Sequence, residues 1–263
     1  MSATAAAPAL PSGPAATHGG EDDDGGLWPM PPGPPDEGHF RTPEVVRDLV
    51  IGVADGLTVP FALAAGLSGA VAANPLIVTA GLAEIAAGCI AMGLGGYLAA
   101  RTEADHYAAE RAREGAEIVE YPERERWEVA AALHRFGVRG AALRAATDSI
   151  CADREAWLDF MMRHELGLEE PERGRAARSA ATIGGAYVAG GLIPLAPYMI
   201  FAETAPALAL SGALTGAALL AFGWLKARAT GLPPGRGALQ TFAIGGLAAA
   251  VAYLVAAAVG GAL

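Results

Sequence analysis

Residues 75–100 read PLIVTAGLAEIAAGCIAMGLGGYLAA, a run of 26 residues in which Glu84 is the single charged side chain. A helix of roughly 20 residues crosses the hydrocarbon core of a membrane, which is about 30 Å thick. The many Ala and Gly residues of the run are typical of helices that pack closely together in lipid. We therefore predict a transmembrane helix here.

Four further stretches have the same length and character, at approximately 47–71, 179–201, 205–225 and 238–262. Over the whole chain 53% of residues are hydrophobic and 17% are charged, and soluble domains usually carry roughly 25% charge. Between the first two stretches, Asn74 is expected to cap the second helix and Pro75 to stand in its first turn. The sequence predicts an all-α integral membrane protein with five transmembrane helices.

Basic residues cluster at alternate ends of these five spans. They lie before the first span, after the second, before the third, and between the fourth and fifth. Because short loops rich in Lys and Arg stay in the cytosol, we expect a cytosolic N-terminus and a C-terminus on the far side. The polar segment between the second and third spans is then cytosolic as well.

Composition sets the expected domains. Residues 1–40 are rich in Ala, Pro and Gly with an acidic patch, which predicts a disordered tail and not a signal or transit peptide. Residues 41–100 hold transmembrane helices 1 and 2, and residues 176–263 hold helices 3 to 5. Residues 101–175 contain nearly all the charge and are predicted to form a helical domain.

Within this domain the pattern is helical throughout. One helix is expected to continue without a break from the second span to about Val119, and another to start at Pro122. One or two more fill 140–167, with Asp153 as a cap.

The net charge of −10 argues against nucleic acid as a partner, because binding phosphates requires clustered Lys and Arg. A cationic ligand fits better. Cys89 and Cys151 form no CxxC motif, so they predict neither a disulfide framework nor a thiolate metal site.

Asp55 stands well inside the first span. A carboxylate at the centre of a membrane helix costs roughly 2.5–3.5 kcal/mol, so it is expected to face a polar pathway, a cation or a proton. Pro60 cannot donate a hydrogen bond to the carbonyl of Gly56, which leaves a backbone oxygen free beside the carboxylate. The alternative is a structural aspartate paired to a neighbouring helix.

Glu84, Gly88 and Met92 follow one another at four-residue intervals in the second span, so they share one helix face. Oxygen beside soft sulfur suits a first-row transition ion. For Met92 the alternative is a methionine that fills a gap in the core.

Acidic residues also form a pattern in the segment 101–175. At 100° per residue, five side chains of its first helix lie within an arc of roughly 80°: Glu103, His106, Glu110, Glu114 and Glu117. The later helices add Glu125, Glu128, Met161, Met162 and Glu165. If these helices pack together, carboxylates and thioethers converge into a site for divalent metal.

The alternative for this acidic face is a solvated surface, because Arg111, Arg113, Arg124 and Arg126 are interleaved with the glutamates for pairing. Glu103 and His106 also match the ExxH pattern of di-iron carboxylate proteins, which need a second such motif. None occurs in the sequence, so we reject a carboxylate di-iron oxidase. We also expect no other enzymatic activity and no prosthetic group.

Three motifs now stand together: DGLTVP at 55–60, FMMRHELGLE at 160–169 and GGLIPLAPY at 190–198. With Glu84 and Met92, they resemble the vacuolar iron transporter family, from about residue 43 to the C-terminus. The resemblance implies a homodimer of five-span subunits that exports Fe²⁺, often also Mn²⁺, Co²⁺ or Zn²⁺, in exchange for protons. It also implies a three-helix cytosolic domain that binds the metal.

The resemblance assigns roles to individual residues. Asp55, Glu84 and Met92 match the transport path, and Glu44 and Asp48 match acidic positions at its cytosolic mouth. The ligands of the cytosolic domain are matched, directly or by a neighbouring position, by Glu103, Glu114, Glu117, Glu125, Glu128, Met161, Met162 and Glu165.

Two other functions compete with transport: a membrane-anchored buffer or sensor of divalent metal, and a scaffold protein. Asp55 and Glu84 speak against both, since a simple anchor has no use for carboxylates in lipid. Abundant Arg, Ala and Gly with almost no Lys favours the inner membrane of a bacterium. In a eukaryote the vacuolar membrane is expected.

Overall fold

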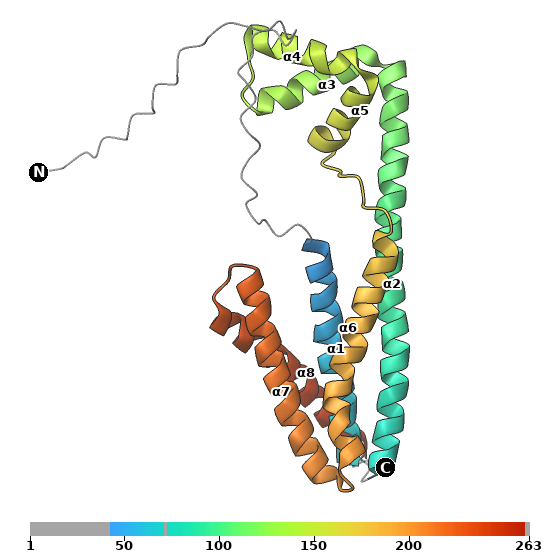
Figure 1. Ribbon diagram of the computed structural model, residues 1–263, viewed down its shortest axis with the longest axis vertical. Helices are drawn as coiled ribbons and strands as arrows, with labels where there is room; N and C mark the ends of the chain where they lie inside the picture. The colour runs from blue at the N-terminus through green and yellow to red at the C-terminus, as the bar shows by residue number, and fades with distance from the viewer. Residues whose placement is uncertain (1–42, 71–72, 261–263) are drawn as a thin grey trace, which may run out of the picture. The chain divides into compact units, whose positions relative to one another are not determined.

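The computed structural model describes residues 43–70 and 73–260, and among these residues it contains helices and no strand. The elements in order are α1 (Pro43–Ala70), α2 (Asn74–Glu120), α3 (Pro122–Arg135), α4 (Gly140–Ala152), α5 (Arg154–Phe160), the π-helical turn η1 (Met161–Glu165), α6 (Arg175–Ile200), α7 (Thr204–Ala229) and α8 (Pro234–Gly260) (Figure 1). The predicted all-α class is confirmed. The predicted tail, residues 1–40, lies outside the described residues.

Five of these helices, α1, α2, α6, α7 and α8, are long and apolar enough to cross a membrane. Each of the five predicted spans falls on one of them. The structure therefore confirms a multi-pass helical membrane protein.

The start of α2 differs in one respect from the prediction. Pro75 stands in the first turn as expected, but Asn74 does not cap the helix. Its side-chain Nδ2 donates to the carbonyl of Phe201 at 2.7 Å, and its Oδ1 accepts from Thr204 Oγ1 at 2.8 Å. Because the Asn74 amide is buried, it needs partners for both its donor and its acceptor, and these two contacts tie the start of α2 to the turn between α6 and α7.

Glycines let α6 approach both α1 and α2. A Cβ atom on Gly56 of α1 would lie 2.5 Å from the backbone oxygen of Tyr187, and one on Gly88 of α2 would lie 2.5 Å from the ring of the same tyrosine. No larger residue fits at either position without a shift of backbone or ring. Tyr187 is thus held between the two helices that carry Asp55 and Glu84.

Beyond its membrane-spanning part, α2 continues without a break to Glu120 (Figure 1), close to the predicted end at Val119. We call residues 101–175 the acidic segment. Its helices pack around one apolar core, which consists of Ile118, Val129, Trp157, Leu158, Met161 and Met162.

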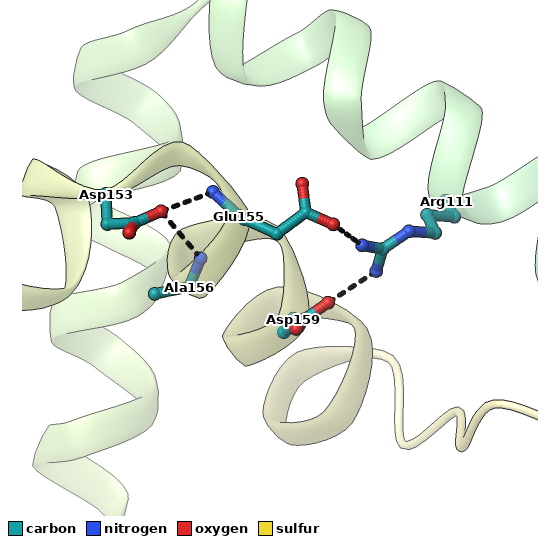
Figure 2. A network of polar contacts seen from close by, with 5 residues as sticks. All are labelled: Arg111, Asp153, Glu155, Ala156 and Asp159. Carbon is teal, nitrogen blue, oxygen red and sulfur yellow. Dashed lines mark hydrogen bonds and ion pairs between the residues drawn. The ribbon is translucent and has the colours of Figure 1, made fainter.

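Figure 2 shows the polar contacts that cap the start of α5 and that join α5 to α2. The Asp153 carboxylate accepts from the backbone N–H of Glu155 at 2.8 Å and of Ala156 at 3.2 Å, which confirms the predicted cap. Arg111 on α2 donates to Glu155 and to Asp159, which lie one turn apart on α5. One guanidinium therefore holds α5 against α2.

Candidate metal centre

Three glutamates from different elements converge in the acidic segment. Glu114 of α2, Glu125 of α3 and Glu165 at the end of η1 each place a carboxylate oxygen within 4.8 Å of the other two. We call these three residues the acidic cluster. Their convergence is a consequence of core packing, since each lies four residues from a core side chain, as the pairs Glu114–Ile118, Glu125–Val129 and Met161–Glu165 show.

The acidic cluster is short of partners. Glu125 is 0% exposed and neither of its carboxylate oxygens has a hydrogen-bond partner, and one oxygen of the buried Glu114 also lacks one. Two full negative charges no more than 4.8 Å apart repel by about 3.5 kcal/mol or more at an effective dielectric constant of about 20. A buried, unpartnered carboxylate adds a desolvation penalty. The arrangement therefore favours the uptake of a proton or a cation.

The pKa values of two members reflect this environment. Burial raises the pKa of Glu125 to about 7, and the charges of Glu128 and Glu114 act in the same direction. Burial also raises the pKa of Glu165 to about 7, assisted by a hydrogen bond to Glu128 and by its charge. Near neutral pH these carboxyls are partly protonated, and a divalent cation can replace the protons that they hold.

Glu117 and Glu128 lie at the edge of the acidic cluster, and we call them the outer glutamates. Each faces an arginine of its own helix. Arg113 Nε lies 3.7 Å from Glu117 Oε1, and Arg124 Nε lies 3.0 Å from Glu128 Oε1. The outer glutamates therefore differ from Glu125, because they have a cation within 4 Å, as Glu114 also has in Arg113 at 3.8 Å.

The two predicted methionine ligands lie in the same π-helical turn as Glu165. Met161 and Met162 are 0% and 1% exposed and belong to the apolar core. Their thioethers are therefore part of the apolar core. In the chain they precede Glu165 of the acidic cluster by four and three residues.

Two predicted ligands are not brought to the acidic cluster. Glu103 pairs with Arg175 at the start of α6, and it precedes Glu114 by three turns of α2, about 16 Å along the helix axis. Glu110 pairs with Arg113 Nη2 at 2.6 Å. For these two residues, the alternative of acidic side chains paired with interleaved arginines describes the structure.

Within the spans, Glu84 is the best-defined polar group. Its Oε1 accepts from the hydroxyl of Tyr187, while its Oε2 is buried without a partner. The sequence analysis missed Tyr187. A signal was present, because the hydroxyl of a tyrosine inside an apolar span needs a partner.

The other predicted path residues lie on α1 and α2. Asp55 is partly buried and adjoins Gly56, which contacts Tyr187. Met92 is partly buried two turns beyond Glu84. Nearer the start of α1, Asp48 is 4% exposed with Arg47 Nε 3.6 Å away, and Glu44, in the first turn, is partly exposed.

Five apolar helices, two of which carry a carboxylate inside the apolar stretch, are joined to a helical segment where glutamates converge. These features define a multi-pass membrane protein suited to handling cations. The chain belongs to the VIT family, whose sequence model matches residues 46–257. This confirms the family predicted from the sequence motifs.

Proteins from plants and yeast are similar over most of their length. The chain is 53% identical over 223 residues to vacuolar iron transporter 1 of Oryza sativa subsp. japonica, covering 85% of this chain and 88% of that protein. It is 52% identical over 220 residues to vacuolar iron transporter 1 of Arabidopsis thaliana, covering 84% and 88%. It is 36% identical over 229 residues to protein CCC1 of Saccharomyces cerevisiae, covering 82% and 70%.

Proposed function

We propose that this protein transports ferrous iron across a membrane, out of the cytosol, and that its acidic segment collects the ion. Membership of the VIT family and relatives named as vacuolar iron transporters support iron as the cargo. The observation that carries the collecting role is Glu125, a fully buried carboxylate with both oxygens unpartnered, aimed into the acidic cluster.

The ligand chemistry fits a divalent metal. Each carboxylate of the acidic cluster supplies oxygen, and the charge of a dication offsets the repulsion among three acids. Glu117 and Glu128 extend the ligand set, and thioethers from Met161 or Met162 would favour a first-row transition ion over calcium or magnesium. On the same grounds, Mn²⁺, Co²⁺ and Zn²⁺ are further cargo candidates.

In the spans, Asp55, Glu84 and Met92 are proposed to form the transport path, with Glu44 and Asp48 at its mouth. The buried, unpartnered oxygen of Glu84 supports this role, because such a group in lipid is costly unless a cation or proton reaches it. Carboxylates that bind metal when deprotonated and release it when protonated make exchange for protons the natural coupling.

The proposed setting follows from charge and relatives. The distribution of basic residues favours a cytosolic N-terminus and a cytosolic acidic segment. Relatives named as vacuolar transporters favour the vacuolar membrane in a eukaryote, and in a bacterium the inner membrane takes its place. We propose a homodimer as the working unit.

The competing function is a membrane-anchored buffer or sensor that binds metal without moving it. The acidic cluster alone suits that role as well as it suits transport. The carboxylates of Glu84 and Asp55 favour transport, since an anchor has no use for them.

The test is iron flux in sealed vesicles that contain the purified protein, with a fluorescent chelator inside. We expect Fe²⁺ to enter these vesicles faster than protein-free vesicles. Entry should be faster still when the vesicle interior is more acidic than the outside. Metal binding without flux would identify a buffer or sensor. Flux that ignores the pH gradient would refute proton exchange and leave iron transport standing.

A further inference from the structure

Two arginines reach into the ligand set of the acidic segment. Arg113 on α2 places Nη2 2.6 Å from Glu110 Oε2 and 3.8 Å from Glu114 Oε1, and its Nε lies 3.7 Å from Glu117 Oε1. One guanidinium therefore faces three carboxylates, one of which belongs to the acidic cluster.

Arg124 on α3 has an equivalent place beside Glu128, the second outer glutamate. Its Nε donates to Glu128 Oε1 at 3.0 Å, and Glu128 also shares a hydrogen bond with Glu165. Arg113 and Arg124 thus each face one outer glutamate, while neither carboxylate oxygen of Glu125 has a hydrogen-bond partner among the described residues.

Both arginine side chains are largely exposed to solvent. The Arg113 and Arg124 side chains are 55% and 65% exposed, and ion pairs at this level of exposure contribute little to stability. Arg111 and Arg126 differ, because they are 27% and 36% exposed and pair with acidic residues outside the ligand set.

We propose that Arg113 and Arg124 are tethered cations that hold the outer glutamates in the metal-free protein and lower its metal affinity by competing with the ion. The inference rests on the proposed function, in which the acidic segment binds a divalent metal.

The competition has a physical reason. Glu117 and Glu128 each lie three residues beyond a member of the acidic cluster, so they are the next carboxylates available to an ion that needs more than three ligands. They can bind it once their arginines have moved into solvent. A dication brings two charges, as many as the two arginines take away, whereas K⁺ brings only one and cannot replace both.

The arginines therefore select for divalent ions. They also keep the site from holding its ion too tightly, which a collecting site requires if it is to pass the ion on.

The experiment uses the full chain in detergent, with Mn²⁺ as the probe and the loss of the free-ion electron paramagnetic resonance signal as the readout. We expect Arg113→Gln and Arg124→Gln each to bind Mn²⁺ about three- to tenfold more tightly than wild type at low ionic strength. The gain should shrink in high salt. Arg113→Lys, which keeps the charge, should bind like wild type.

Arg126→Gln is the matched control, because it removes the same charge from the same helix as Arg124→Gln but breaks a pair with Asp148. It should change Mn²⁺ affinity far less. A second readout replaces N-methyl-D-glucamine by K⁺ at constant ionic strength. K⁺ should weaken Mn²⁺ binding by the doubly substituted Arg113→Gln, Arg124→Gln protein and leave wild type nearly unaffected.

Equal or weaker Mn²⁺ binding by both Gln variants, with saturable binding by wild type, would overturn the inference alone. Weaker binding would mean that the arginines position the glutamates for the ion. Wild-type protein that binds no Mn²⁺ would overturn the proposed collecting role, and the inference with it.

Discussion

Asp55 and Glu84 are the residues whose chemistry is hardest to explain without a cargo. Both lie on apolar helices. The hydroxyl of Tyr187, on α6, donates to Glu84, and the backbone of Tyr187 lies against Gly56, which adjoins Asp55. A purely structural carboxylate in lipid would be expected to satisfy both its oxygens. Glu84 leaves one of them buried and free.

We predict that Asp55→Ala reduces iron flux in vesicles to the level of protein-free vesicles. Metal binding by the acidic segment should persist, because the two sites lie on different elements. Asp105→Ala is a suitable control, since Asp105 is exposed and pairs with Arg101, one turn away on α2. Retained flux in Asp55→Ala would remove Asp55 from the transport path.

For Met92→Leu we predict a changed preference among metals with flux retained. A thioether favours softer ions and contributes no charge, so its loss should lower Fe²⁺ and Co²⁺ flux relative to Mn²⁺. Competition between these ions in the same vesicles measures the change. An unchanged profile would mean that Met92 is a packing residue.

Asp55 and Glu84 could be proposed from the sequence alone, because charge in a long apolar run is conspicuous. Glu103 and Glu110 were proposed on the same ground as Glu114, but the structure does not bring them into the acidic cluster. Helical periodicity shows which residues share a face but not how far a partner helix reaches along it. In the structure, α3 and η1 meet α2 near Glu114, and Glu103 and Glu110 lie beyond them with arginine partners.

Among the elements, η1 is the one that local sequence rules did not predict. Residues 161–165 are compatible with an ordinary α-helix, and π-helical turns are rare and often mark functional sites. By contrast, the end of α2 and the starts of α3 and α5 were predictable, because Pro122 and Asp153 are strong local signals.

The Asp153 cap offers a test at this scale. Asp153→Ala should cost about 1 kcal/mol of helix stability and increase amide hydrogen exchange in α5. Because α5 runs directly into η1, Mn²⁺ binding should weaken as Glu165 becomes less well placed. Asp153→Asn, which keeps a good capping side chain, should restore both properties. Normal Mn²⁺ affinity in Asp153→Ala would show that η1 does not depend on the start of α5.

At the scale of the whole molecule, the number of spans followed from hydropathy, but their packing did not. Glycines in the spans indicate close contact without naming the partner helix. The structure identifies α6 as the helix that contacts Gly56 of α1 and Gly88 of α2. Pairing of this kind depends on complementary surfaces along the whole length of each helix.

The metal-free protein should lose stability as pH rises through the acid range. Glu125 and Glu165 have an ordinary pKa of 4.5, and the fold raises both values to about 7. Below pH 4.5 both carboxyls are protonated in the folded and the unfolded chain. Between pH 4.5 and about 7 the unfolded chain releases these protons and the folded chain retains them. Stability must then fall with rising pH.

A dication replaces those protons, so Mn²⁺ should raise the melting temperature most above pH 7 and little near pH 5. Unfolding of the full chain in detergent can be followed by circular dichroism at each pH.

Other carboxylates also titrate in this range, so the informative comparison is with Glu125→Gln. This variant should melt at a higher temperature than wild type above pH 7 and respond less to Mn²⁺. Glu123→Gln, an exposed change in the first turn of the same helix, should behave like wild type. If Glu125→Gln and Glu123→Gln melt alike at every pH, with and without Mn²⁺, then Glu125 carries no unfavourable charge in the folded protein. The acidic cluster would then have no need of an ion.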